Sequence, residues 1–258
     1  MSRLRVIRDG ARDGPFNMEA DRRLLAAQRP DGSPVLRLYR WSPPAVSFGY
    51  HQRLTDFDQA AIRDAGFDLV QRPTGGRAIL HADELTYAVV GSSPSDLFGP
   101  TLHTSYQTIN RALLIFLRWL GIAADVSAGE SRAAQRSAVC FRSAGRHEIR
   151  VAGRKLIGSA QRRNEAVFLQ HGSILTGPGH ADLVRLLAHN KASTLQGTGA
   201  GECPPTAARE RLLAATTDLG RLLARPVDST LYEELETQLV DAFAAAWSLD
   251  PEVVPPGE

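Results

Sequence analysis

The sequence predicts an α+β fold in which mixed, largely antiparallel sheets are flanked by helices, with a helical C-terminal segment. A length of 258 residues suits one large domain. Strands and helices are mixed without the regular strand–helix alternation of a doubly wound sheet. A series of short, β-branched stretches after the middle of the chain is typical of a β meander. We therefore place residues 1–258 in one domain and residues 179–258 in its helical C-terminal part.

Turn residues divide the first half of the chain into predicted elements. Asn17 is a suitable cap for the first helix, whose apolar stripe includes Met18 and Leu25. Gly66 and Gly121 close the next two helices, because glycine readily adopts the backbone conformation that follows a last turn. The predicted helices span 17–29, 55–65 and 104–120, and the predicted strands span 35–41, 45–49, 67–71 and 85–90.

The second half of the chain begins with the meander and ends in helices. Residues 128–137 are small, polar and Arg-rich, which predicts an exposed loop before the meander. From Gly179 onward we expect helices, interrupted by a loop over 196–205. The last helix is predicted to begin at Thr230, with Glu233 completing a capping box. The three strands of the meander are predicted at 147–151, 154–161 and 166–175.

Composition excludes several classes of protein. The 30 Lys+Arg residues nearly balance 28 Asp+Glu, and a net charge of +2 does not by itself indicate a nucleic acid or membrane partner. The apolar run 112–117 is too short to span a bilayer, and residues 1–14 lack the apolar core of a secretory signal. Two cysteines, Cys140 and Cys203, cannot build a disulfide framework, which favours the reducing cytoplasm.

The first candidate site is the turn 72–77, which lies between two predicted strands. Its paired glycines, Gly75 and Gly76, allow backbone amides to approach a ligand, and the flanking Arg72 and Arg77 can hold an anion or a carbonyl oxygen. A plain hairpin turn with surface arginines fits the same spacing. No Gly-Lys-Ser/Thr sequence follows the turn, so it is not a Walker phosphate loop.

The second candidate is Lys155, within the stretch 153–161. Only Lys155 and Lys191 among the 30 basic residues are lysines, which raises the question of whether arginine would fail at these positions. A lysine beside glycine and other small residues in a strand can reach into a narrow cavity and polarise a carbonyl group. The alternative is a hairpin strand that carries a solvated lysine.

Cys140 is the third candidate. Basic neighbours such as Arg136, Arg142 or Lys155 would favour the thiolate form, which is the reactive nucleophile. A free cysteine is more often a small, inert hydrophobic residue, so local sequence leaves both interpretations open.

Other motifs are excluded by their spacing. Ser159 lacks the Gly-x-Ser-x-Gly elbow of a hydrolase. Residues 197–201 imitate a dinucleotide-binding motif but follow no predicted strand, which favours a flexible loop. No metal site is expected, because neither His-x-x-x-His nor Cys-x-x-Cys spacing occurs among His81, His103, His147 and His171.

Together these segments resemble the lipoate-protein ligase and octanoyltransferase superfamily, which shares a catalytic domain with biotin protein ligases. The resemblance runs from residue 17 to about residue 195. It is most specific in the turn 72–81 and the strand 153–161, which are joined by 169–173. The resemblance implies that residues 1–258 form one catalytic domain with the biotin/lipoate protein ligase fold.

Within that superfamily the sequence is most similar to the cysteine-dependent octanoyltransferases of the LipM type. Gly75-Gly76-Arg77 stands where ligases usually carry a third glycine, and Cys140 lies 15 residues before Lys155, where those transferases place their acyl-accepting cysteine. The asparagine–aspartate pair of the ligases is absent from that region. The resemblance implies Cys140 and Lys155 as catalytic residues. It implies as substrate-binding residues Arg72, Thr74, Gly75, Gly76, Arg77, Ala78, His81, Gly158, Ser159, Ala160, His171 and Gly172.

The implied reaction moves an octanoyl group from octanoyl-acyl carrier protein to a lysine of a lipoyl-accepting protein through a Cys140 acyl-enzyme, with no cofactor and no metal. Lys155 and amides of the glycine turn would stabilise the oxyanion. His81 or His171 would serve as the base or would orient the site. The octanoyl chain would occupy a tunnel, for which we expect Ile79, Val89 and Leu156 as lining residues.

The resemblance also implies partners and alternatives. The expected acceptor is the glycine cleavage H protein or the lipoyl domain of a dehydrogenase E2 subunit. We expect a cytoplasmic monomer that binds neither nucleic acid nor membrane. One alternative is a lipoate-protein ligase that uses ATP and Mg²⁺, and a second is a non-catalytic module that only docks lipoyl domains or carrier proteins.

Overall fold

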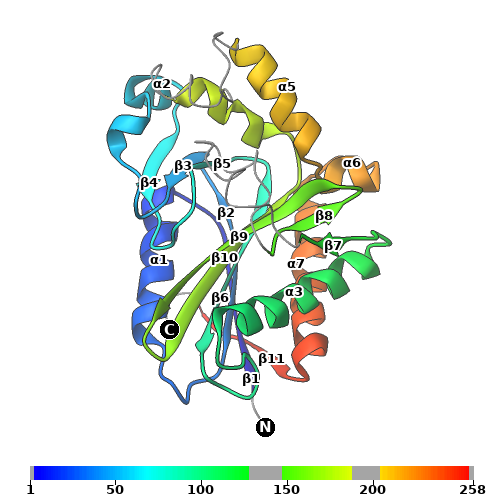
Figure 1. Cartoon of the computed structure of the whole chain (residues 1–258). Coiled ribbons are helices and arrows are strands. Elements are labelled where there is room, and N and C mark those ends of the chain that lie inside the picture. The colour runs from blue at the N-terminus through cyan, green and yellow to red at the C-terminus, as the bar shows by residue number, and fades with distance from the viewer. Residues whose placement is uncertain (1–2, 128–146, 188–203, 256–258) are drawn as a thin grey trace.

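A computed structural model describes residues 3–127, 147–187 and 204–255, and it builds them around two β-sheets (Figure 1). The larger sheet has eight strands in the order β11-β1-β2-β6-β10-β9-β8-β7. In chain order these strands are β1 (Arg3–Arg12), β2 (Val35–Trp41), β6 (Glu84–Ser92), β7 (Asp125–Val126), β8 (Ile149–Val151), β9 (Arg154–Asn164), β10 (Val167–Leu175) and β11 (Asp250–Val253).

Strand directions confirm the predicted mixed, largely antiparallel architecture. In the larger sheet β1 runs parallel to both β2 and β11, and the other neighbouring pairs are antiparallel. The smaller sheet has three strands, and β3 pairs in parallel with β4 and antiparallel with β5. Its strands are β3 (Ala45–Phe48), β4 (Asp68–Gln71) and β5 (Ile79–His81).

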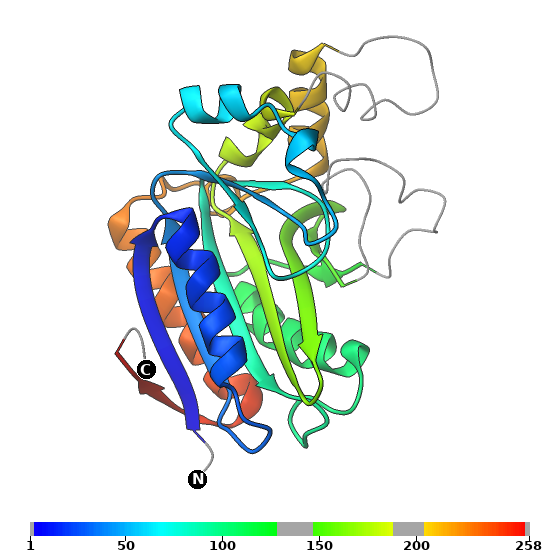
Figure 2. The ribbon, with the colours of Figure 1, turned by 90° about the vertical axis from the view of Figure 1, so that its left-hand side faces the viewer.

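Helices cover both faces of the larger sheet (Figure 2). The helix α1 (Gly14–Ala27) covers one face, and α3 (Leu102–Trp119) and α7 (Ser229–Trp247) cover the other. Successive side chains of a strand point to opposite faces, so both faces of β2 are apolar. Leu36 and Leu38 pack in the core with α3 and α7, whereas Val35 and Tyr39 pack with α1. The site described below lies on the α1 side of the sheet.

Shorter helices surround the three-stranded sheet at one end of the molecule (Figures 1 and 2). The 3₁₀ helix η3 packs against β5, α2 and α5. No helix in the described ranges has the length and apolarity needed to cross a bilayer. These helices are η1 (Leu54–Asp56), α2 (Gln59–Asp64), η3 (Gly179–Leu186), α5 (Pro205–Ala215) and α6 (Leu219–Leu223).

Two predicted helix caps are wrong. The first helix begins at Gly14, where Asp13 is the cap and accepts a hydrogen bond of 2.7 Å from the amide of Phe16. Asn17 is instead buried within α1. The last helix begins at Ser229, because Asp228 accepts from the amide of Leu231 at 2.9 Å, so no capping box forms. In both cases an aspartate just before the predicted cap takes the position that a short acceptor side chain favours.

The sequence also missed four strands, β1, β5, β7 and β11, and merged two helices. β1 carries five charged side chains and one glycine among its ten residues, and its pattern does not alternate cleanly. β7 and β11 are short edge strands whose pairing with β8 and β1 is set by tertiary contacts. The predicted helix 55–65 is two separate elements, η1 and α2. Among the described residues of the C-terminal part 179–258, the elements are helices except for β11.

Arg37 lies at the centre of a buried charge cluster that joins β1, β2 and α1. Its guanidinium donates to Asp9 at 2.5 Å and to Asp21 at 2.8 Å, and a further 2.8 Å hydrogen bond reaches Asn17 Oδ1. It also stacks over the ring of Tyr39, 3.9 Å from the centroid. Burial alone would raise the pKa of Asp21, but its hydrogen bond to His171 and the charge of Arg37 hold that pKa below the ordinary value.

Replacing Arg37 by methionine should lower the free energy of unfolding by about 3–5 kcal/mol at pH 7, because Asp9 and Asp21 would remain buried without their partner. A group whose pKa is lowered on folding contributes stability above its unfolded pKa, and that contribution is lost as the pH falls through the folded pKa. The deficit of R37M relative to the unmutated protein should therefore shrink below about pH 4. Urea unfolding from pH 3 to pH 8 checks this, and a deficit independent of pH would contradict it.

Candidate active site

A cavity lies where β3, β5 and the glycine turn meet the ends of β9 and β10. Nine of the predicted site residues line it, together with apolar and aromatic side chains that include Met18, Tyr39, Trp41 and Ile79. Val89 and Leu156, which we expected in an acyl tunnel, instead belong to the core that packs against α3 and α7. The nine residues are Arg72, Gly76, His81, Lys155, Gly158, Ser159, Ala160, His171 and Gly172.

Arg72 holds the glycine turn in place from within. Its buried guanidinium donates to the carbonyl oxygens of Gly75 at 2.9 Å, Arg77 at 2.6 Å and Ser47 at 3.1 Å. Gly76 has φ of +93°, a conformation that favours glycine. Gly49 must also be glycine, because a Cβ there would lie 2.0 Å from the carbonyl oxygen of Gly76. We expected Arg72 to hold an anion or a carbonyl oxygen of a ligand, but it binds carbonyl oxygens of its own turn instead.

The other residues of the predicted turn lie outside the cavity lining. Ala78 is buried in the core, and Gly75 and Arg77 take part through their carbonyl oxygens, which bind Arg72. Thr74 is buried and lies 2.7 Å from His171 Nε2 through its hydroxyl. These residues lie behind the side chains that line the cavity and support them.

Lys155 points its ammonium into the cavity, although the alternation of β9 would send it to the opposite face. The pairing of β9 with β8 steps from Ile157 directly to Lys155 while β8 advances by one residue, so Leu156 forms a β-bulge. Ile157 packs in the core. The extra residue at the bulge turns the side chain of Lys155 to the cavity face of β9. The end of the Lys155 side chain packs directly against Gly158, where an added Cβ would lie 2.7 Å from Nζ.

Glu148 holds the ammonium of Lys155. The distance from Nζ to Oε1 is 2.6 Å, and both residues are more than nine-tenths buried. Such a buried pair is costly to desolvate, so retaining it points to a use for the charge. The sequence gave no sign of Glu148 as a site residue. It comes directly before β8, and only the pairing of β8 with β9 brings it to the lysine.

His81 is fixed on both ring nitrogens. Nε2 lies 2.7 Å from Ser47 Oγ, and Nδ1 lies 2.8 Å from Glu84 Oε1. Trp41 stacks on the imidazole with ring centroids 4.0 Å apart. Burial alone would raise the pKa of Glu84, but the charge of His81 and hydrogen bonds from His81, Thr86 and Ser173 lower it. Ser47 and Trp41 are further cavity residues that sequence reasoning missed.

His171 repeats this arrangement on the neighbouring strand β10. Its Nε2 bonds Thr74 in the glycine turn, and its Nδ1 lies 2.8 Å from Asp21 Oδ2. Asp21 in turn binds Arg37, so the charge cluster of the core ends at the cavity wall. Both histidines therefore orient hydroxyl groups and hold the turn against the sheet.

The cavity combines a buried ammonium with apolar and aromatic side chains. A buried ammonium can stabilise negative charge on a carbonyl oxygen, and the aromatic lining can receive an alkyl chain. Cys140 falls outside the described residues. Among those residues, no three His, Cys, Asp or Glu side chains are grouped as a metal site would require.

Comparison with known proteins assigns the chain to a family. Residues 13–206 match the lipoyl protein ligase A/B catalytic domain, and the chain belongs to this family. Octanoyltransferase LipM of Moorella thermoacetica is 36% identical over 261 residues, which cover 98% of this chain and 89% of that protein. Octanoyltransferase LipM of Symbiobacterium thermophilum is 37% identical, with 95% and 85% covered. Within the family, the chain is an acyltransferase.

Solved structures support the fold. The bi-partite lipoate protein ligase of Thermoplasma acidophilum superposes with a TM-score of 0.75 at 18% identity, over 100% of this chain and 89% of that one. A lipoate-protein ligase A bound with ATP superposes with a TM-score of 0.72 at 21% identity, over 100% and 90%. These likenesses confirm the predicted lipoate protein ligase-like architecture.

Gly158→Ala should displace the ammonium and slow acyl transfer by about 10²-fold. The new methyl group would meet only Cε and Nζ at the flexible end of Lys155, so the melting temperature should change little. Steady-state rates and thermal unfolding of the variant check both parts. Unchanged turnover would show that the ammonium need not lie across this glycine.

Proposed function

We propose that this protein transfers an octanoyl group from octanoyl-acyl carrier protein to a lysine of a lipoyl-accepting protein, with Cys140 as the intermediate acyl carrier. The observation that carries the proposal is the Lys155 ammonium, buried in an apolar cavity and held by Glu148 at 2.6 Å. The similarity to octanoyltransferases over nearly the whole chain supports it. The acceptors we propose are the glycine cleavage H protein and E2 lipoyl domains.

The reaction consists of two acyl exchanges. In the first, the Cys140 thiolate attacks the thioester carbonyl, and the thiolate of the carrier's arm leaves with the pair of electrons of the broken C–S bond. In the second, the neutral amine of the acceptor lysine attacks the Cys140 thioester, the C–S bond breaks, and the departing cysteine thiolate takes up the proton that the amine loses. Thioester is exchanged for thioester and then for amide, so neither step needs a nucleotide or a redox partner.

Lys155 acts on the oxygen in both steps. Its ammonium donates a hydrogen bond to the carbonyl oxygen as negative charge develops there, in a cavity shielded from water. Glu148 keeps the ammonium in that position before the substrate arrives. The octanoyl chain occupies the space beside Trp41, Ile79 and Met18, which line the same cavity.

We assign His81 and His171 to positioning. Each imidazole already has a carboxylate on Nδ1 and a hydroxyl group on Nε2, which leaves no ring nitrogen to take a proton directly from the acceptor amine. Their hydrogen bonds keep Ser47 and Thr74, and with them the glycine turn, at a fixed place relative to Lys155.

Intact mass spectrometry after mixing with octanoyl-acyl carrier protein, without nucleotide, tests the acyl-enzyme. The protein should gain one octanoyl group that hydroxylamine removes, and Cys140→Ser should gain none. If transfer requires ATP and free octanoate or lipoate, the chain is a ligase and Cys140 is incidental. If neither activity is found while carrier or lipoyl domains still bind, it is a docking module.

Lys155→Arg should reduce transfer by about 10²-fold or more, because the planar guanidinium is larger and directs its donors differently. The matched control is Arg154→Lys, which makes the reverse exchange at the adjacent, exposed position and should leave the rate unchanged. Rates for both variants, measured with the same donor and acceptor, decide the point. Near-normal turnover by K155R would remove Lys155 from the mechanism.

A further inference from the structure

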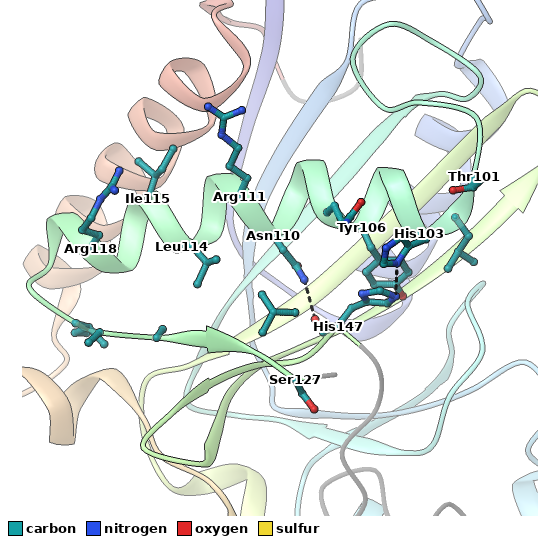
Figure 3. A pocket seen from close by; sticks show the side chains of 16 residues that line it. Thr101, His103, Tyr106, Asn110, Arg111, Leu114, Ile115, Arg118, Ser127 and His147 are labelled. Atoms are coloured by element: carbon teal, nitrogen blue, oxygen red, sulfur yellow. Dashed lines mark hydrogen bonds between the residues drawn. The ribbon is translucent and has the colours of Figure 1, made fainter. Parts of the chain in front are cut away.

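A second, larger depression lies along α3 (Figure 3). α3 covers the face of the larger sheet opposite to α1 (Figure 2). Its volume is about 1520 Å³, which is ample for an extended organic ligand. Its floor is apolar, and Leu114, Ile122 and Val126 contribute to it. We call this depression the α3 groove.

The α3 groove contains a buried hydrogen-bond acceptor that has no partner. Asn110 is 2% exposed, and its amide nitrogen donates to the carbonyl oxygen of His147 at 2.9 Å. Its Oδ1 accepts no hydrogen bond from any described residue. An unpaired buried amide oxygen is costly, so a ligand N–H at this position would be favoured.

The charge of the groove is positive. His103 and His147 lie together at one end, and Arg111 and Arg118 project from the adjoining surface of α3 (Figure 3). No aspartate or glutamate is among the described residues that line the groove, and neither arginine has an ion pair within the described ranges.

The groove and the active-site cavity share one stretch of backbone. His147 lines the α3 groove, while the next residue, Glu148, binds Lys155 in the cavity. The amide of Ser127, another groove residue, donates to the carbonyl oxygen of Glu148 at 2.8 Å. The two sites thus adjoin on opposite sides of this backbone. β7 is the edge strand of the larger sheet, so a long, flexible ligand lying in the groove would reach Lys155 by passing round this edge.

We propose that the α3 groove binds the phosphopantetheine arm of the acyl donor. The arm combines three features that match the groove: amide N–H groups for Asn110 Oδ1, a branched aliphatic segment for the apolar floor, and an anionic phosphodiester for Arg111 or Arg118. It is also several times longer than a lysine side chain. The acceptor lysine, in contrast, must dock directly at the cavity. This inference rests on the proposed octanoyl transfer and concerns how the donor is recognised.

Three donors test the proposal: octanoyl-acyl carrier protein, octanoyl-CoA, and octanoyl-N-acetylcysteamine, which lacks the phosphate and most of the arm. The test variant is Gln107→Trp, because Gln107 is exposed on the groove side of α3 and a bulky ring there blocks the groove without entering the core. Gln107→Trp should raise KM about tenfold for the first two donors and leave that for the third unchanged. The matched control, Glu233→Trp on the exposed surface of α7, should change none of them.

Each other result overturns the proposal. An effect on the carrier protein alone would make the groove a protein-docking surface, and an equal effect on all three donors would place the defect in the chemistry. No effect would leave the groove without this role. Titration of the unmutated protein with 4′-phosphopantetheine, followed by calorimetry, should show binding that Gln107→Trp weakens. Transfer from octanoyl-N-acetylcysteamine by the unmutated protein tests the octanoyl-transfer function separately.

Discussion

The position of the active site depends on a charge buried in the core. Arg37 is held by Asp9 on β1 and Asp21 on α1, and Asp21 passes the contact on to His171 on β10. The hydrogen bond from His171 to Thr74 then reaches the glycine turn. A buried guanidinium requires these partners, and removing one leaves an uncompensated charge. The same interactions that hold α1 against the larger sheet therefore fix the turn that closes the cavity.

The β-bulge in β9 decides where the buried ammonium of Lys155 lies. Without the bulge at Leu156, strict alternation would direct Lys155 toward α3 and α7 rather than into the cavity. Gly158 then gives the side chain its path, and Glu148 gives the ammonium its partner. Bulges of this kind re-aim side chains next to functional sites, at the expense of one pair of ladder hydrogen bonds.

The two depressions of the molecule differ in size and in chemistry. The cavity is narrow, apolar and provided with one ammonium, whereas the α3 groove is wide and basic and includes an unpaired amide oxygen. They meet at two successive residues, His147 and Glu148, whose side chains serve the two sites separately. In the reaction we propose, a donor with a long arm would keep its bulk outside while its thioester reaches the ammonium.

The sequence alone determined the fold class and the meander, because these depend on turn residues and periodicity that lie close together in the chain. It also singled out the glycine turn and Lys155 as candidate site residues. Only the tertiary structure decided the partners: Glu148 for Lys155, Ser47 and Glu84 for His81, and the carbonyl oxygens that occupy Arg72. The tertiary structure also decided the edge strands β7 and β11, because their own composition does not indicate that they pair with β8 and β1. Contacts between residues distant in the chain depend on strand register, and register is fixed by the packing of the whole sheet rather than by any local pattern.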